Sequence, residues 1–129
     1  MTPDAGQQGI EQPGTDQADA GQPDAERPFA LVVRFHLVPG HEAAFDLLAA
    51  AMVDAVTANE PDTLAYTVHE VDGVLGERVF YELYRTHGAF EEHERQPHTR
   101  RILAELDEHI TSFDVDRLHV SRSCDRRSP

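Results

Sequence analysis

Two histidines, His93 and His98, lie on either side of Pro97 in a short polar segment. An imidazole has an unperturbed pKa of about 6.5, so it can take up or release a proton near neutral pH. His93 is therefore our first candidate for a catalytic base or for a group that stabilises an anion. The alternative is a histidine at the end of a surface helix. His98 either faces the same site or only begins the next helix, where the helix dipole disfavours its charged form.

A carboxylate and two phenols lie in apolar segments of the same chain. Glu82 is in the middle of the apolar segment 78–85, and buried carboxylates are rare unless they are paired. We predict that Glu82 pairs with an arginine or a histidine, with Arg34 as a plausible partner. Such a pair is either purely structural or orients a catalytic histidine. Tyr84 and Tyr66 offer hydroxyl donors on an aromatic wall, and each is also typical of a core.

Eight histidines suggest a metal site, but their spacing argues against one. None forms the H-E-x-x-H pair, and His93 and His98 are separated across a proline, unlike helical i,i+4 ligands. The sequence also has no glycine-rich phosphate loop and no nucleophile elbow, and its lone cysteine lies in a tail. We therefore predict no native metal site, no nucleotide cofactor and no acyl-enzyme chemistry.

Hydrophobic periodicity predicts the elements that position these residues. Apolar β-branched segments indicate strands, apolar residues at helical spacing indicate helices, and Pro and Gly mark the boundaries. The predicted order is β–α–β–β–α–β, the ferredoxin-like α+β arrangement, with the second helical region divided at Pro97. The expected elements are a strand at 29–38, a helix at 41–59, strands at 64–71 and 78–85 joined by a loop, helices at 86–95 and 98–109, and a strand around 113–118.

One domain over residues 28–120 is expected between two disordered tails. Residues 1–27 are acidic and rich in Gln, Pro and Gly, with too few large apolar side chains to offset the entropy of ordering. Residues 121–129 are also polar and are predicted to fray. A body of about 90 residues is marginally stable alone, and a four-stranded sheet with helices on one face leaves the other face bare. We therefore expect a homodimer formed through that face.

Composition restricts the partners of the chain. The formal net charge of the 129 residues is -13, which argues against binding to nucleic acid. Cys124 is the single cysteine, so no internal disulfide can form, as suits a reducing compartment. No apolar segment approaches the roughly 18 residues of a membrane helix, and no secretory signal is present. A cytoplasmic protein without membrane partners is expected.

The segment Glu82-Leu83-Tyr84, followed by the His-x-x-x-Pro-His element at 93–98, resembles the antibiotic biosynthesis monooxygenase family, nearest to its quinol monooxygenase branch. Pro39-Gly40 after the first strand matches a turn of that family. Glu60-Pro61-Asp62, before a strand that carries Tyr66, matches its Glu-Pro-Gly element. The resemblance covers the whole predicted domain and neither tail.

This resemblance implies a dimeric α+β barrel with a pocket between the sheet and the helices of each subunit. It implies oxidation of a quinol or polycyclic phenol to a quinone with dioxygen, without metal, flavin or other cofactor. The expected catalytic residues are then His93, His98 and Glu82, and the expected substrate-binding residues are Tyr84, Tyr66 and Arg34.

Two other functions stay open. Tyr84 stands where the family typically has a tryptophan, and the chain has no tryptophan at all. This substitution favours a module that binds small ligands without changing them. The third possibility is haem binding or degradation through His93, although related haem degraders use a tryptophan and a first-strand asparagine, where this chain has Arg34.

Overall fold

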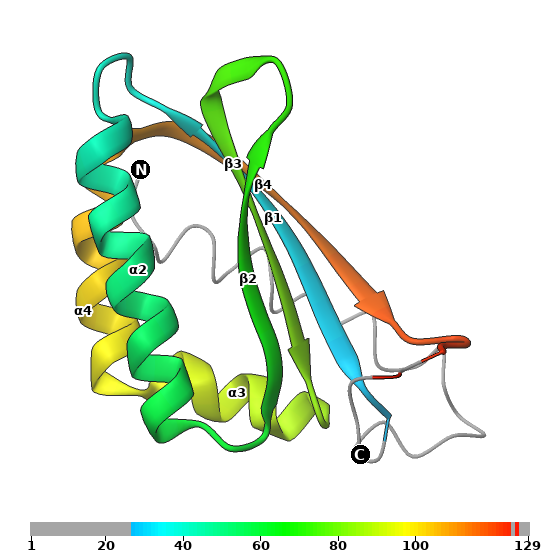
Figure 1. The fold of residues 1–129 in the computed structure, drawn as a ribbon. Coiled ribbons are helices and arrows are strands. Elements are labelled where there is room, and N and C mark those ends of the chain that lie inside the picture. The colour runs from blue at the N-terminus through cyan, green and yellow to red at the C-terminus, as the bar shows by residue number, and fades with distance from the viewer. Residues whose placement is uncertain (1–26, 125, 127–129) are drawn as a thin grey trace.

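The computed structural model describes residues 27–124 and residue 126. Four antiparallel strands form one sheet in the order β2-β3-β1-β4, and the helices lie on one side of it (Figure 1). No helix within these residues is long and apolar enough to cross a lipid bilayer. The elements are β1 (Phe29–Leu37), α2 (Glu42–Asn59), β2 (Thr63–Val71), β3 (Val74–Tyr84), α3 (His87–Arg95), α4 (Pro97–Leu106), the 3-10 turn η3 (Asp107–His109) and β4 (Ile110–His119).

This order confirms the predicted ferredoxin-like α+β fold. The predicted tail at 1–27 falls almost entirely outside the described residues. Of the predicted tail at 121–129, only residues 121–124 and 126 are described, and they form neither helix nor strand.

Helix α2 covers the sheet with a single apolar stripe. Its buried residues, Phe45, Ala49, Met52 and Val56, follow one another at intervals of three or four, so they lie on one face of the helix. The turn before the helix uses Gly40 with a φ of 88°, a conformation that favours glycine. Helix α2 ends at Asn59 because Pro61 disfavours helical geometry in the residue before it. That residue is Glu60.

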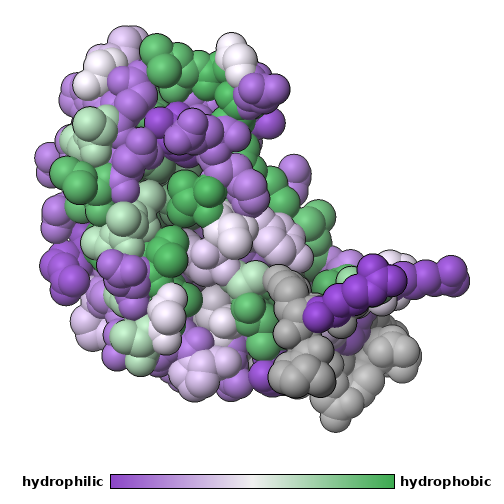
Figure 2. Space-filling view, in the orientation of Figure 1, coloured by the Kyte–Doolittle hydropathy of each residue, from purple (hydrophilic) through white to green (hydrophobic). Residues whose placement is uncertain are grey.

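The hairpin between β2 and β3 is shorter than the sequence predicts. Asp72 and Gly73 alone connect the strands, Val71 pairs with Val74, and Gly73 has a φ of 78°. Strand β3 therefore begins four residues earlier than expected from its apolar segment. Val74 and Leu75, close to the tip of this hairpin, are exposed apolar residues. Figure 2 shows hydrophobic surface at the end of the molecule where Figure 1 draws the β2–β3 hairpin.

Alternation along β3 divides its side chains between two environments. Phe80, Glu82 and Tyr84 are buried on the face that the helices cover. Tyr81 and Leu83 lie on the opposite face, where the described chain places no helix. A glutamate with large aromatic neighbours is thus built into the core itself.

A change of direction at Pro97 brings the two imidazoles together. Thr86 caps α3 by accepting a hydrogen bond from the backbone N–H of Ala89 at 3.1 Å. Gln96 is extended, and Pro97 occupies the first turn of α4, where its missing N–H costs nothing. His93 in the last turn of α3 and His98 in the first turn of α4 are consequently both buried beside the C-terminal end of α2.

Candidate active site

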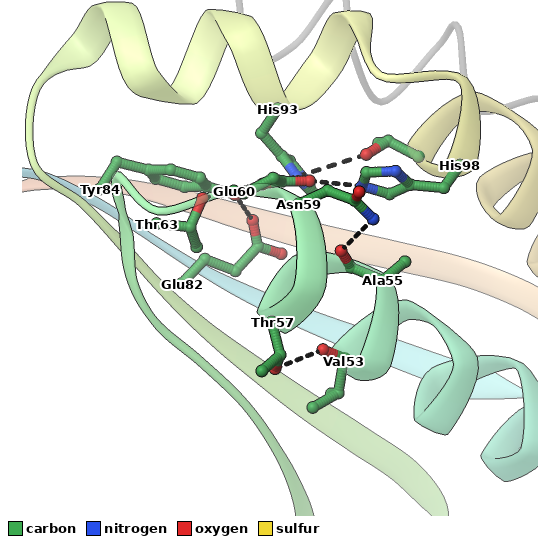
Figure 3. A network of polar contacts seen from close by, with 11 residues as sticks. Val53, Ala55, Thr57, Asn59, Glu60, Thr63, Glu82, Tyr84, His93 and His98 are labelled. Carbon is green, nitrogen blue, oxygen red and sulfur yellow. Dashed lines mark hydrogen bonds and ion pairs between the residues drawn. The ribbon is translucent and has the colours of Figure 1, made fainter.

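A single carboxylate binds both imidazoles. The Nδ1 atom of His93 lies 2.8 Å from Oε1 and 3.0 Å from Oε2 of Glu60, and Nε2 of His98 lies 2.5 Å from Oε2 (Figure 3). All three side chains are buried, with 8% of Glu60 and 3% of His93 exposed. We call these three residues the Glu60 cluster.

Glu60 needs these partners because of its position. It caps the C-terminus of α2, where the helix dipole opposes a negative charge. Burial acts to raise the pKa of Glu60. The hydrogen bond and charge of His93, with hydrogen bonds from His98 and Thr63, outweigh burial and lower this pKa to about 2. Thr63 donates to Oε1 at 2.8 Å. Glu60 is therefore ionised at neutral pH.

A second carboxylate lies in the same core among phenols. The Tyr84 hydroxyl donates to Oε1 of Glu82 at 2.6 Å, and Tyr66 lies opposite Glu82 on the neighbouring strand. Burial raises the pKa of Glu82, although His93 and the hydrogen bonds of Tyr84 and Tyr66 act in the other direction. Burial and the Glu82 carboxylate raise the pKa of both tyrosines well above 10, so they remain neutral donors. We call Glu82, Tyr84 and Tyr66 the Glu82 cluster.

His93 connects the two clusters. Its ring centroid lies 5.4 Å from that of Tyr66 and 5.5 Å from that of Tyr84. Burial acts to lower the pKa of His93, but the hydrogen bond to Glu60 and the charges of Glu82 and Glu60 raise it overall. Because Nδ1 faces Glu60, Nε2 is the ring nitrogen that this carboxylate does not engage. Such a carboxylate–imidazole pair orients a general base.

A small cleft leads from the surface to this pair. Its volume is about 150 Å³, and its walls come from the end of α2, the start of β2 and helix α3. This is below the roughly 300–1,000 Å³ of pockets for drug-sized ligands. The lining residues are Asn59, Glu60, Pro61, Asp62, Thr63, Ala89, Glu92, His93 and Gln96.

The predicted pairing of Glu82 with Arg34 is wrong. Arg34 bonds to Glu77 instead, and its side chain is 44% exposed on the sheet face that has no helices. In the β1–β3 register Leu31, three residues before Arg34, lies opposite Glu82, and alternation turns Arg34 to the other side of the sheet. The structure thus separates Arg34 from the other five predicted site residues, which it brings together.

Sequence reasoning missed Glu60, the centre of the first cluster. Its signal was available, since a carboxylate directly before a helix-ending proline and at a helix C-terminus needs compensation. However, Glu60 is 33 residues from His93 and 38 from His98 along the chain. Spacing within a single segment cannot reveal such a contact.

The fold and the buried clusters define a small ferredoxin-like α+β domain with a candidate acid–base centre between its sheet and helices. The model of the family "Antibiotic biosynthesis monooxygenase" matches residues 28–105. This match spans more than half of the chain, and the protein belongs to that family, as its sequence resemblance predicts. A comparison with curated proteins found no significant match.

Solved structures agree with this assignment at the level of the fold. A protein from Caulobacter crescentus, provisionally described as an antibiotic biosynthesis monooxygenase, has 19% identity and a TM-score of 0.72 over 76% of this chain and 93% of that chain. A similarly described protein from Deinococcus radiodurans has 17% identity and a TM-score of 0.68 over 75% and 96%. A Mycobacterium tuberculosis protein has 29% identity and a TM-score of 0.70 over 76% and 99%.

Proposed function

We propose that this protein is a cofactor-independent monooxygenase that oxidises a quinol or related phenol to a quinone with dioxygen. The observation that carries the proposal is the His93–Glu60 pair at the wall of the cleft, with the rings of Tyr66 and Tyr84 against the imidazole. The cleft volume of about 150 Å³ favours a single-ring substrate over a polycyclic one.

Dioxygen is a triplet and reacts slowly with closed-shell molecules, so the substrate must first become electron-rich. In our proposal His93 removes the phenol proton, and the Glu60 carboxylate stabilises the imidazolium that forms. The phenolate passes one electron to dioxygen. The phenoxyl and superoxide radicals combine at a ring carbon that carries hydrogen, and the peroxide takes the proton back from His93. Loss of water from this peroxide leaves the quinone.

Residues outside the pair have supporting roles in this proposal. His98 shares the Glu60 carboxylate and holds it in place. The negative charge of Glu82 favours the protonated form of His93 after proton transfer. Tyr66 and Tyr84 form the aromatic wall behind the imidazole. Arg34 has no part in the mechanism because it lies on the other side of the sheet.

Oxygen uptake with single-ring and fused-ring hydroquinones, phenols and anthrones tests the proposal. We expect uptake by the wild-type chain and incorporation of one oxygen atom from labelled dioxygen into the product. His93→Ala should lower the rate by at least about 100-fold, the effect typical of losing a general base. His69→Ala is the matched control, since His69 lies exposed on β2 and bonds to a backbone carbonyl. No uptake with any compound, or equal rates in both variants, would contradict the proposal.

Non-catalytic ligand binding is the second candidate function, and Tyr84 in place of the tryptophan typical of the family favours it. In that case mass spectrometry would recover a bound phenol chemically unchanged after incubation in air. Haem binding fits the site less well, because only 3% of His93 is exposed and its ring lies against two tyrosines.

We also propose that two copies pair through the sheet face that has no helices. This face carries Ala30, Val32, Tyr81, Leu83 and Leu118, which are apolar or aromatic. Burying such a surface stabilises an association by about 25 cal/mol per Å² before the costs of binding. Light scattering should give twice the chain mass for the wild type and the single-chain mass for Tyr81→Glu.

A further inference from the structure

We propose that Glu60, His93 and His98 bind a divalent transition-metal ion of the zinc class. One carboxylate oxygen and two imidazole nitrogens, one ligand atom from each residue, all lie within 4.8 Å of one another. Two histidines and one carboxylate are a donor set that zinc uses when it keeps a further coordination position open. This inference goes beyond the proposed oxidation. It also differs from the prediction, made from the spacing of the histidines, that the chain has no metal site.

The positions of the three proposed ligands are fixed by the fold around them. They come from the end of α2, the last turn of α3 and the first turn of α4, so packing of three helices fixes their separation. Thr63, the first residue of β2, donates to Oε1 of Glu60 at 2.8 Å. Such outer hydrogen bonds orient metal ligands and strengthen binding.

The dimensions suit a cation after a small adjustment. Zinc lies about 2.1 Å from nitrogen and oxygen ligands, which places tetrahedral ligand atoms about 3.4 Å apart. The carboxylate oxygens of Glu60 now lie 2.8 Å and 2.5 Å from the two nitrogens, with hydrogens shared between them. A cation would replace these hydrogens as the side chains move by about 1 Å. The cleft lined by Glu60 and His93 provides the path from solvent.

Electrostatics and the number of ligands favour a cation at the Glu60 cluster over a second imidazole pair formed by His41 and His109. The ion would lie at the C-terminus of α2, where the helix dipole attracts positive charge, in a chain with a formal net charge of -13. His41 and His109 form another imidazole pair, with 2.9 Å between their Nδ1 atoms. Among the described residues that pair has no third ligand, because Glu60, His93 and His98 are the only group of three or more there.

Metal binding has a consequence for the proposed oxidation, and this consequence rests on that proposal. An ion on Nδ1 of His93 would remove the hydrogen bond by which Glu60 orients the ring as a base. The metal-loaded protein should therefore lose oxygen uptake, whereas protein freed of metal by a chelator should keep it.

Calorimetric titration of the chelator-dialysed full chain with zinc chloride tests the binding directly, and cobalt chloride gives a visible absorption spectrum for the same site. We expect one ion per chain. Glu60→Gln and His98→Gln should each weaken binding by more than the roughly 10- to 100-fold that loss of an outer hydrogen bond causes. His41→Gln is the matched control and should bind as the wild type does.

Equal zinc affinity in the wild type, Glu60→Gln and His98→Gln, or loss of binding only in His41→Gln, would overturn the proposal. If the Glu60 and His98 variants do not fold, X-ray absorption of the cobalt-loaded His41→Gln variant decides, because that variant lacks the rival imidazole pair. Two imidazoles in the coordination shell support the site, and a shell of oxygen alone excludes it. Because these measurements do not depend on oxygen uptake, a chain that binds zinc but oxidises nothing would contradict only the proposed function.

Discussion

Two glutamates in one core have opposite acid–base properties. Glu60 and Glu82 are buried to a similar degree, with exposed fractions of 8% and 5%. The pKa of Glu60 falls to about 2, whereas the pKa of Glu82 rises above its usual 4.5. Burial acts to raise the pKa of both carboxylates, so the lowered pKa of Glu60 comes from its partners. Glu60 contacts His93, whose hydrogen bond and charge lower the Glu60 pKa, and His98, which adds a hydrogen bond. Glu82 accepts a hydrogen bond from a neutral phenol.

The contrast shows that burial alone does not fix the protonation state of a core carboxylate. A partner that carries a proton and a positive charge compensates for lost hydration, and a neutral hydroxyl compensates only in part. Environments that separate the pKa values of neighbouring groups are typical of acid–base sites. His93 lies between the two clusters and receives the influence of both carboxylates.

Glu60→Gln should have the largest effect on folding. The substitution removes the charged acceptor that two buried imidazoles share, and a hydrogen bond to a charged group is worth about 1.5–3 kcal/mol. We expect Glu60→Gln to lower the free energy of unfolding by about 3 kcal/mol in urea titrations at pH 7. Glu82→Gln is the matched variant and should not destabilise the protein. An equal loss of unfolding free energy in Glu60→Gln and Glu82→Gln would contradict the proposed difference between the two clusters.

Tyr84→Phe should have the next largest effect. It deletes the donor that lies 2.6 Å from Glu82 and leaves a buried carboxylate less well compensated. The expected loss is about 2 kcal/mol, within the range for a buried group that loses its hydrogen bond. Tyr81→Phe on the same strand is the control, because Tyr81 lies on the opposite sheet face. A loss as small in Tyr84→Phe as in Tyr81→Phe would show that Glu82 does not depend on this bond.

The pH dependence of Glu82→Gln sharpens the comparison further. The pKa of Glu82 is higher in the folded than in the unfolded chain, where it is about 4.5. Its contribution to stability is therefore present below pH 4.5 and is lost as pH rises through the folded pKa. Relative to the wild type, Glu82→Gln should gain stability between pH 4 and pH 7 in thermal unfolding. If the difference in stability between Glu82→Gln and the wild type does not change with pH, the pKa of Glu82 is not raised by folding.

Arg34→Ala should have the smallest effect. The ion pair of Arg34 with Glu77 lies at the surface, and exposed pairs contribute about 0–1 kcal/mol. We expect Arg34→Ala to lower the free energy of unfolding by less than about 0.5 kcal/mol and to leave its pH dependence unchanged. A large loss that disappears in the Glu82→Gln background would instead mean that Arg34 does reach the core carboxylate.

Local sequence patterns determined the fold of this protein to a large extent. The prolines at 61 and 97, the Pro39-Gly40 turn and the apolar periodicity of α2 predicted the order of the helices and strands and the approximate bounds of β1, α2, β2 and α3. The length of the β2–β3 hairpin was not predicted. The exposed residues Val74 and Leu75 belong to β3, where Val74 pairs with Val71 through the backbone, and no alternation of buried and exposed side chains marks them as strand residues. Backbone preferences and periodicity act over a few residues, so the sequence reports them directly.

Only the tertiary structure decided how the site residues pair. The sequence predicted His93, His98, Glu82, Tyr66 and Tyr84 as candidate site residues, but it assigned Arg34 to Glu82 and did not predict Glu60 as a partner of the imidazoles. One step in alternation turns Arg34 to the far side of the sheet, and the packing of α2 against α4 brings Glu60 to His98 across 38 positions of the chain. Contacts of this kind depend on helix packing and strand register, which many distant residues set together.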